Sequence, residues 1–403
     1  MLLPVLLVLL APGVEDWPQF RGPNSDGHAD QQTAPLVWSD TSNIRWKTDI
    51  PGLGWSSPVV SSNSVWLTTA VEQDGRLSLR CLRLSRSDGS VIWSKEVRLL
   101  KNIPPIHSKN SHASPTPILN GSRLFVHFGT HGTACLNADD GTLLWRNTDI
   151  AYPPVHGSGG SPVLAENHLI LICDGSSSPF VIALDSATGQ IRWKTPRSIT
   201  GRVNHSFATA SLLKSGQRTL VLAPGPDHLA AYDLKSGSEV WHVRADGWSA
   251  VPQPVVTADL VIYNHDYDNP ELIAVRHGGS GDVTESHIAW RLKRGAPSTP
   301  SPLLVDGKLF LVSDTGIASC VNASDGSVYW TKRLGGNFSA SPVYADQRVL
   351  FLSEDGKATW VKPTTEFHVI AECRVTGRTF ATPAFSRGEM LLRTESALLC
   401  VRN

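Results

Sequence analysis

The stretch ALDSATGQIRW, residues 183–193, is one copy of an eleven-residue frame that recurs along the chain. Further copies are CLNADDGTLLW (135–145), AYDLKSGSEVW (231–241) and CVNASDGSVYW (320–330). Each copy begins with a small residue, has glycine at its seventh position and ends in tryptophan. These features together suit a structural element that packs against a neighbouring unit. We therefore interpret the frame as a structural repeat and not as a cofactor signature.

The frame lies inside a longer repeat. Units begin with an apolar run at Pro58, Pro117, Pro162, Ser211, Pro254, Pro302, Pro342 and Pro383. Their spacing of about 40–60 residues is typical of propeller blades. The sixth unit contains four strand-like runs separated by turns, SPLLV, KLFLVS, IASCVN and VYWTKRL. Four short strands per unit predict a β-propeller blade.

The eighth unit lacks a fourth strand, and the missing pattern occurs near the other end of the chain. NIRWKTDI (43–50) has its tryptophan, Trp46, twelve residues before Pro58, as Trp330 is twelve residues before Pro342. We predict an all-β, eight-bladed β-propeller of four-stranded blades in which this N-terminal strand completes the last blade. Such closure removes an exposed sheet edge.

Seven tryptophans end a unit and are expected to dock between blades. They are Trp46, Trp93, Trp145, Trp193, Trp241, Trp290 and Trp330. The fifth unit carries an insertion before its tryptophan, and the seventh has none at this position. Cys135, Cys320 and Cys400 occupy the small position of the frame. Because cysteine there alternates with alanine, we expect free, buried thiols.

The N-terminal run MLLPVLLVLLAPG indicates a secretory signal over residues 1–13, with a buried N-terminal strand as the alternative. The run is too short to span a membrane as a helix. Residues 14–43 are expected to form an arm packed on the propeller, which occupies 44–403. The sequence has 36 Lys and Arg against 36 Asp and Glu, and this balance argues against nucleic-acid binding. We expect an exported monomer in the periplasm or cell envelope.

The frame resembles the tryptophan-docking motif of the pyrroloquinoline quinone (PQQ) repeat propellers, over roughly residues 44–403. That family includes quinoprotein alcohol dehydrogenases and the assembly lipoprotein BamB. DWPQFRGPNSDG (16–27), HFGTHGTACL (127–136) and GGNFSASPVYAD (335–346) resemble exported planctomycete propellers of this type. The resemblance implies either a PQQ-dependent alcohol or sugar oxidoreductase with Ca²⁺, or a BamB-like envelope assembly scaffold. No two cysteines are adjacent, so the vicinal cysteine pair of the dehydrogenases is not matched.

Function in a propeller concentrates where loops meet at one mouth of the central channel. The candidate ligand-binding residues on these loops are Trp55, His112, His131, His156, His205, Trp248, Arg294, Asn337 and Arg378. The imidazoles could bind a metal or act as acid and base, with solvated or strand-capping histidines as the alternative. The tryptophans could stack on a sugar or a planar ring, or only pack the mouth. The arginines could clamp an anion or lie on a solvated rim.

The segment NHDYDNPEL (264–272) places carboxylates at Asp266 and Asp268, which could ligate Ca²⁺ or form an Asx turn. No catalytic constellation is complete in the sequence. We therefore expect a binding module that holds a small molecule or an envelope protein at its channel face, without catalysis. A PQQ-dependent dehydrogenase is the enzyme that the resemblance supports.

Overall fold

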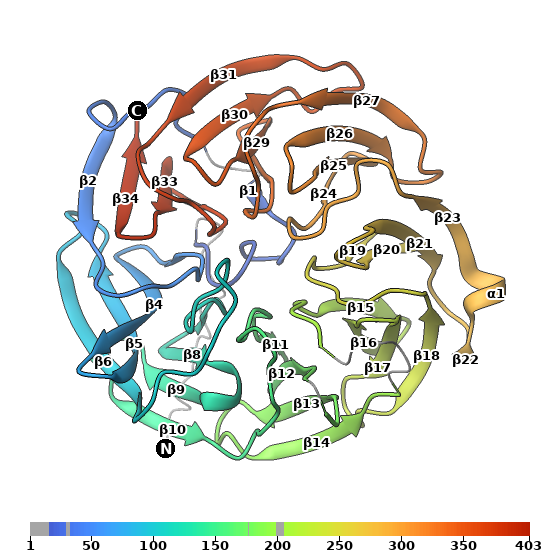
Figure 1. Cartoon of the computed structure of the whole chain (residues 1–403), viewed down its shortest axis with the longest axis horizontal. Helices are drawn as coiled ribbons and strands as arrows, with labels where there is room; N and C mark the ends of the chain where they lie inside the picture. The colour runs from blue at the N-terminus through green and yellow to red at the C-terminus, as the bar shows by residue number, and fades with distance from the viewer. Residues whose placement is uncertain (1–15, 30–32, 176, 199–204) are drawn as a thin grey trace, which may run out of the picture.

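The computed structural model describes residues 16–29, 33–175, 177–198 and 205–403. The predicted signal segment, residues 1–13, lies outside them. Eight sheets are arranged around a central axis (Figure 1), so the eight-bladed all-β propeller is confirmed. Within the described ranges the helices are η1 (Gly129–His131) and α1 (Thr284–His287), and none is long and apolar enough to cross a membrane.

Each blade is a four-stranded antiparallel meander that runs from the channel outward. The first four blades are β3 (Val59–Val60), β4 (Ser64–Gln73), β5 (Arg76–Ser85), β6 (Val91–Leu100); β7 (Ile118–Asn120), β8 (Arg123–His127), β9 (Thr133–Asn137), β10 (Leu143–Asn147); β11 (Val163–Ala165), β12 (His168–Cys173), β13 (Phe180–Asp185), β14 (Ile191–Pro196); and β15 (Ser211–Ser215), β16 (Arg218–Pro224), β17 (His228–Asp233), β18 (Glu239–Arg244).

The other four blades are β19 (Val255–Val256), β20 (Leu260–His265), β21 (Glu271–Arg276), β23 (Ile288–Leu292); β24 (Leu303–Val305), β25 (Lys308–Val312), β26 (Ile317–Asn322), β27 (Val328–Arg333); β28 (Val343–Ala345), β29 (Arg348–Leu352), β30 (Lys357–Val361), β31 (Val369–Arg374); and β32 (Ala384–Ser386), β33 (Glu389–Arg393), β34 (Ala397–Arg402), β2 (Ile44–Asp49). β22 (Gly281–Asp282), from the fifth-blade insertion, pairs with β18 and covers the outer edge of the fourth blade.

The frame joins each blade to the next. In the third blade Ala183 lies opposite Trp193, and the register shifts directly after this pair. The indole N–H of Trp193 donates to the carbonyl of Leu234 in the fourth blade, at 2.9 Å. Gly189 has a φ of +73° and a Cβ there would lie 2.4 Å from the ring of Trp145, in the second blade. The glycine therefore provides both the turn and the room for the preceding tryptophan.

The seventh blade keeps a tryptophan at this place but carries it on the other strand. Trp360 on β30 lies opposite Ala371 on β31, which reverses the arrangement of the small residue and the ring in the frame. Trp38 packs edge-on against Trp360 with ring centroids 6.4 Å apart. The outer strand of this blade has no frame tryptophan, and Trp38 from outside the blade packs on Trp360 instead.

The ring closes between the first and eighth blades. β2 pairs antiparallel with β34, with Trp46 opposite Cys400, so the predicted closure by the N-terminal strand is confirmed. Arg86 of the first blade and Glu389 of the eighth form a buried ion pair at 2.8 Å. The six cysteines are free and buried, as expected.

Residues 16–29 cross the channel at the mouth where the innermost strands end. Trp17 pairs with Val60 of β3, and β1 (His28–Ala29) pairs in parallel with β28. Arg21, which is 1% exposed, donates to the carbonyl of Pro302 at 2.6 Å. These contacts with the first, sixth and seventh blades hold the segment across the far mouth.

Candidate functional site

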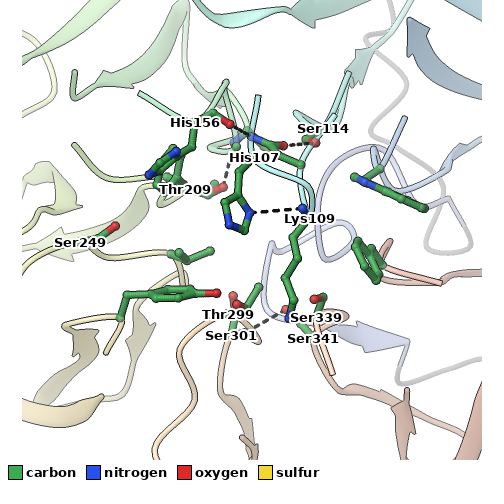
Figure 2. Close-up of a pocket in the computed structure, with 18 of the residues that line it drawn as sticks. His107, Lys109, Ser114, His156, Thr209, Ser249, Thr299, Ser301, Ser339 and Ser341 are labelled. Carbon is green, nitrogen blue, oxygen red and sulfur yellow. Dashed lines mark hydrogen bonds between the residues drawn. The ribbon is translucent and has the colours of Figure 1, made fainter. Parts of the chain in front are cut away.

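A cavity of about 410 Å³ occupies the mouth opposite this segment. It is lined by the mouth loops, which we define as the segments leading from the outer strand of one blade into the innermost strand of the next. Figure 2 shows that these loops bring side chains from many blades to the channel axis. Phe20 of the N-terminal segment also lines the cavity. The volume is within the usual range for small-molecule pockets.

A row of rings forms one wall of the cavity. His107, His156, His205 and Trp248 come from the mouth loops that lead into four successive blades, the second to the fifth. Neighbouring ring centroids in this row are 5.4, 5.4 and 5.6 Å apart. Phe207 lies between two of the imidazoles, at 6.2 and 5.8 Å. The row offers aromatic surface together with ring nitrogens.

The imidazoles of His156 and His205 favour the neutral form. Burial lowers the pKa of His156, and the neighbouring His107 lowers it further. Burial also lowers the pKa of His205, and its neighbour His156 adds to the effect. A neutral imidazole has one N–H donor and one nitrogen acceptor. At neutral pH these rings can therefore donate a hydrogen bond to a polar ligand and also accept one from it.

A second wall consists of Trp55 and Phe380, whose centroids are 4.5 Å apart with an interplanar angle of 37°. They belong to the first and eighth blades, next to the closure of the ring. Arg378 lies over Phe380 at 4.8 Å from its centroid and is exposed. The guanidinium therefore covers the outer side of this wall and is not part of the cavity lining.

Hydroxyl groups ring the channel deeper in the cavity. They belong to Ser57, Thr116, Ser161, Thr209, Ser301, Ser341 and Thr382, which we call the hydroxyl girdle. The backbone N–H of one member donates to the hydroxyl of the next, as from Thr116 to Ser161 at 2.9 Å and from Ser301 to Ser341 at 3.0 Å. Gln253 takes the place of a hydroxyl in the fifth blade. The girdle joins the inner ends of the blades and presents oxygens to the cavity.

One ion pair spans the mouth. Lys109, from the loop that leads into the second blade, contacts Glu354 of the seventh blade at 3.0 Å. Glu354 also accepts a hydrogen bond from Ser339 at 2.6 Å. In Figure 2 the side chain of Lys109 extends across the cavity toward Ser339 and Ser341. Burial lowers the pKa of Lys109, but Glu354 and nearby acidic groups outweigh this and raise its pKa overall.

A buried polar network lies behind the ring wall, between the third and fourth blades. Asp174 pairs with Arg197 at 3.2 Å and accepts a hydrogen bond from Ser206 at 2.6 Å. Arg197 also contacts His228 at 3.2 Å, and burial followed by this positive charge lowers the pKa of His228 to about 4. Because Ser206 follows His205 directly, the network holds the loop that carries the His205 ring.

The structure gathers some of the predicted site residues and separates others. Trp55, His156, His205, Trp248 and Asp268 line the cavity. The remaining candidates lie outside its lining: His112, His131, Asp266, Arg294, Asn337 and Arg378.

Their local contacts explain this separation. His112 and His131 pack on each other at 6.2 Å, away from the row of rings. Arg294 and Asn337 are exposed. Asp266 accepts a hydrogen bond from the backbone N–H of Asp268 at 3.0 Å, which forms an Asx turn. Within the described residues, no group of three His, Cys, Asp or Glu side chains is placed to hold a metal ion.

The sequence patterns do not predict several of the residues that line the cavity. His107 and Lys109 stand in the long segment after β6, where position in the chain does not reveal which side chains turn inward. The hydroxyl girdle, in contrast, left a clear signal. Six members directly precede the proline that begins a repeat, as SP or TP, and Thr209 stands two residues before Ser211 in the fourth repeat. Serine and threonine are common in these repeats, which hid the regular placement.

The comparisons with known proteins agree with the architecture. The family described as outer membrane protein assembly factor BamB matches residues 29–205, 180–303 and 282–366. The chain belongs to this family. Subunit 1 of the methanol dehydrogenase [cytochrome c] of Methylorubrum extorquens is 26% identical over 211 residues. That match covers 46% of this chain and only 30% of the relative.

Solved structures show the same fold at low identity. BamB from Moraxella catarrhalis superposes with a TM-score of 0.60 at 14% identity, covering 88% of this chain and 98% of that one. A europium-containing methanol dehydrogenase gives 0.70 at 10% identity, covering 95% and 90%. At such identities the likeness concerns the fold.

The lining residues that the structure describes do not fit PQQ with Ca²⁺. PQQ is a flat tricarboxylate, which calls for several cationic partners. Among the described lining residues Lys109 is the one Lys or Arg, and it is already paired with Glu354. The carboxylate that lines the cavity, Asp268, has no second and third ligand grouped with it among the described residues. The lining offers aromatic rings and hydroxyls instead.

Proposed function

We propose that this protein is a binding module that holds an uncharged small molecule in the mouth cavity. The observation that carries the proposal is the construction of that cavity. Aromatic rings form two of its walls, hydroxyls encircle its deeper part, and Phe20 contributes from the far mouth. Apolar surface with a few convergent polar groups is the usual composition of a ligand pocket.

A screen of small molecules against the full-length chain tests this proposal. Trp55 and Trp248 line the cavity, so a ligand there should change the tryptophan fluorescence and raise the melting temperature. Calorimetry should give one site per chain. The variant Phe207→Ala should weaken the binding of each confirmed ligand, while Arg294→Ala, which alters an exposed residue outside the cavity, should not. Ligands that bind both variants equally would place the site elsewhere and refute the proposal.

The working compartment is part of the same proposal. The apolar run at residues 2–10 and the membership of the BamB family support export to the periplasm or envelope. Fractionation of cells that express the full chain, followed by N-terminal sequencing, tests it. Recovery of a processed protein outside the cytoplasm is the expected result, and an intact N-terminus in the cytoplasmic fraction would refute export.

A protein-assembly role is the second candidate. The family match and the coverage of nearly the whole length of a BamB structure support it. Such a role needs a surface that partners can reach, and the outer strands carry exposed aliphatic residues such as Val91, Ile92 and Leu144. Cross-linking of the protein in envelope fractions distinguishes the two. A specific protein adduct that survives Phe207→Ala would favour assembly over cavity binding.

A further inference from the structure

The hydroxyl girdle has hydrogen-bonding capacity that the protein does not use. Among the described residues, the hydroxyls of Thr116, Ser161, Thr209, Ser341 and Thr382 accept a backbone hydrogen bond, and that of Ser301 does likewise. None of them donates one there. The Ser57 hydroxyl makes no hydrogen bond to described residues. The girdle therefore presents several O–H donors to the cavity, and a matching ligand would carry oxygen acceptors.

Ser249 provides a second, independent observation. Its side chain lines the cavity, is 3% exposed and has a φ of +132°. Its buried hydroxyl has no partner among the described residues. The indole N–H of its neighbour Trp248 is also buried without a partner there. No described residue satisfies these two donors, which belong to residues at the wall of the cavity.

The cavity is also two-sided. The row of rings and the pair of Trp55 and Phe380 provide flat apolar surface. Thr299, Ser301, Ser339 and Ser341 lie together on another side in Figure 2. A pyranose ring has the same two characters, since its C–H faces are apolar and its edge bears hydroxyls that both donate and accept. Aromatic side chains can cover such a face while hydroxyls and neutral imidazoles bind the edge.

The charges of the lining favour a neutral ligand. Among the described lining residues, Lys109 is paired with Glu354 at 3.0 Å, and the other charged one, Asp268, is exposed. The imidazoles of His156 and His205 are kept neutral by burial. An acidic sugar would bring a carboxylate to a cavity whose described lining residues include no unpaired cation. We infer that the mouth cavity binds a neutral saccharide, an inference that rests on the proposed function of this cavity.

Calorimetric titration of the full-length protein tests the inference. The probes are neutral gluco-, galacto-, manno- and xylo-disaccharides, a disaccharide that contains a uronic acid, and PQQ with and without Ca²⁺. At least one neutral disaccharide should bind with one site per chain and change the tryptophan fluorescence. The uronic-acid compound of the same linkage should bind at least tenfold more weakly.

Two variants and one control locate the site. Ser57→Ala removes a hydroxyl with no structural bond among the described residues and should weaken binding roughly two- to tenfold. Trp248→Ala should weaken it at least tenfold, with circular dichroism used to verify the fold. Arg294→Ala is the control and should bind like the unaltered protein.

The outcomes separate the two levels of the proposal. If the uronic-acid compound or PQQ binds in preference to every neutral sugar, and Trp248→Ala weakens it, the saccharide inference is overturned and the cavity stays a binding site. If no sugar binds at all, the saccharide inference is likewise overturned. If a sugar binds but Ser57→Ala and Trp248→Ala leave its affinity unchanged, both the inference and the proposed site are wrong.

Discussion

Single residues of the frame act across the boundary between blades. Gly189 turns the chain in its own blade, and the ring of Trp145 from the preceding blade lies on it. Gly237 stands in the same relation to Trp193, and Gly326 to Trp290. The glycine is needed for its positive φ and also for the missing Cβ, which the neighbouring ring would strike. One position therefore serves the local turn and the packing of two blades.

The two demands on the frame glycine can be measured separately. Gly189→Ala should destabilise the protein by about 3 kcal/mol, because it combines an unfavourable φ with a Cβ 2.4 Å from the Trp145 ring. Gly216→Ala is the matched control, since its φ is +59° and a Cβ there would meet no atom within 4 Å. It should cost about 1 kcal/mol. Urea unfolding gives both values, and equal values would show that the ring contact contributes nothing.

At the scale of strands, the ring depends on how the first and eighth blades are joined. β2 completes the eighth sheet, and Arg86 reaches Glu389 in that blade across the blade boundary. Arg45 of β2 also pairs with Glu389. The carboxylate is 2% exposed, so these two arginines replace the water contacts that it loses on burial. Backbone pairing and a buried ion pair thus close the ring at the same place.

Breaking this ion pair should be costly. Arg86→Met leaves the buried carboxylate of Glu389 with less compensation and should lower the free energy of unfolding by about 3–5 kcal/mol. Arg374→Met is the matched control, because the Arg374–Asp355 pair is more than half exposed on both sides. It should change stability by less than about 1 kcal/mol. Thermal denaturation of both variants measures the two losses of stability. Similar losses would show that the buried pair at the closure contributes no more than an exposed surface pair.

The strands and their order were predictable because each repeat carries its own periodic signal. Trp46 and its neighbours share the pattern of Trp193, so even a strand displaced to the other end of the chain could be assigned. The mouth was harder to predict. His107 and Lys109 lie in an irregular segment, and whether such side chains turn toward the axis depends on packing among several blades. Arg294 stands in a mouth loop, as His156 and His205 do, yet its side chain is exposed and does not line the cavity.

The whole molecule contains histidines that are buried in the neutral form. Burial lowers the pKa of His127 to about 3 and, together with Arg197, that of His228 to about 4. In the unfolded chain both would titrate near 6.5. The unfolded state therefore binds more protons between these values, and stability rises with pH across this interval. The contribution is present above about pH 6.5 and is lost as the pH falls toward 4.

Unfolding in urea at pH 7 and pH 4.5 tests this dependence. His127→Gln removes one titrating group, so the variant does not lose the stability that the unaltered protein loses on acidification. The difference in free energy of unfolding between the two proteins should therefore be about 2–3 kcal/mol smaller at pH 4.5 than at pH 7. His368→Gln changes an exposed histidine and should leave the pH dependence as it is. A difference for His127→Gln that stays constant with pH would mean that this side chain does not resist protonation.

The pairing of β2 with β34 delays the completion of the ring until the end of synthesis. The ribosome makes β2 early, but its partner strand emerges about 350 residues later. At translation rates of 5–20 residues per second, the early strand waits roughly 20–70 s for that partner. During this time the sheet of the eighth blade cannot form and the ring stays open. The nascent chain therefore depends on chaperones, or on transport in an unfolded state, until the final hairpin is available.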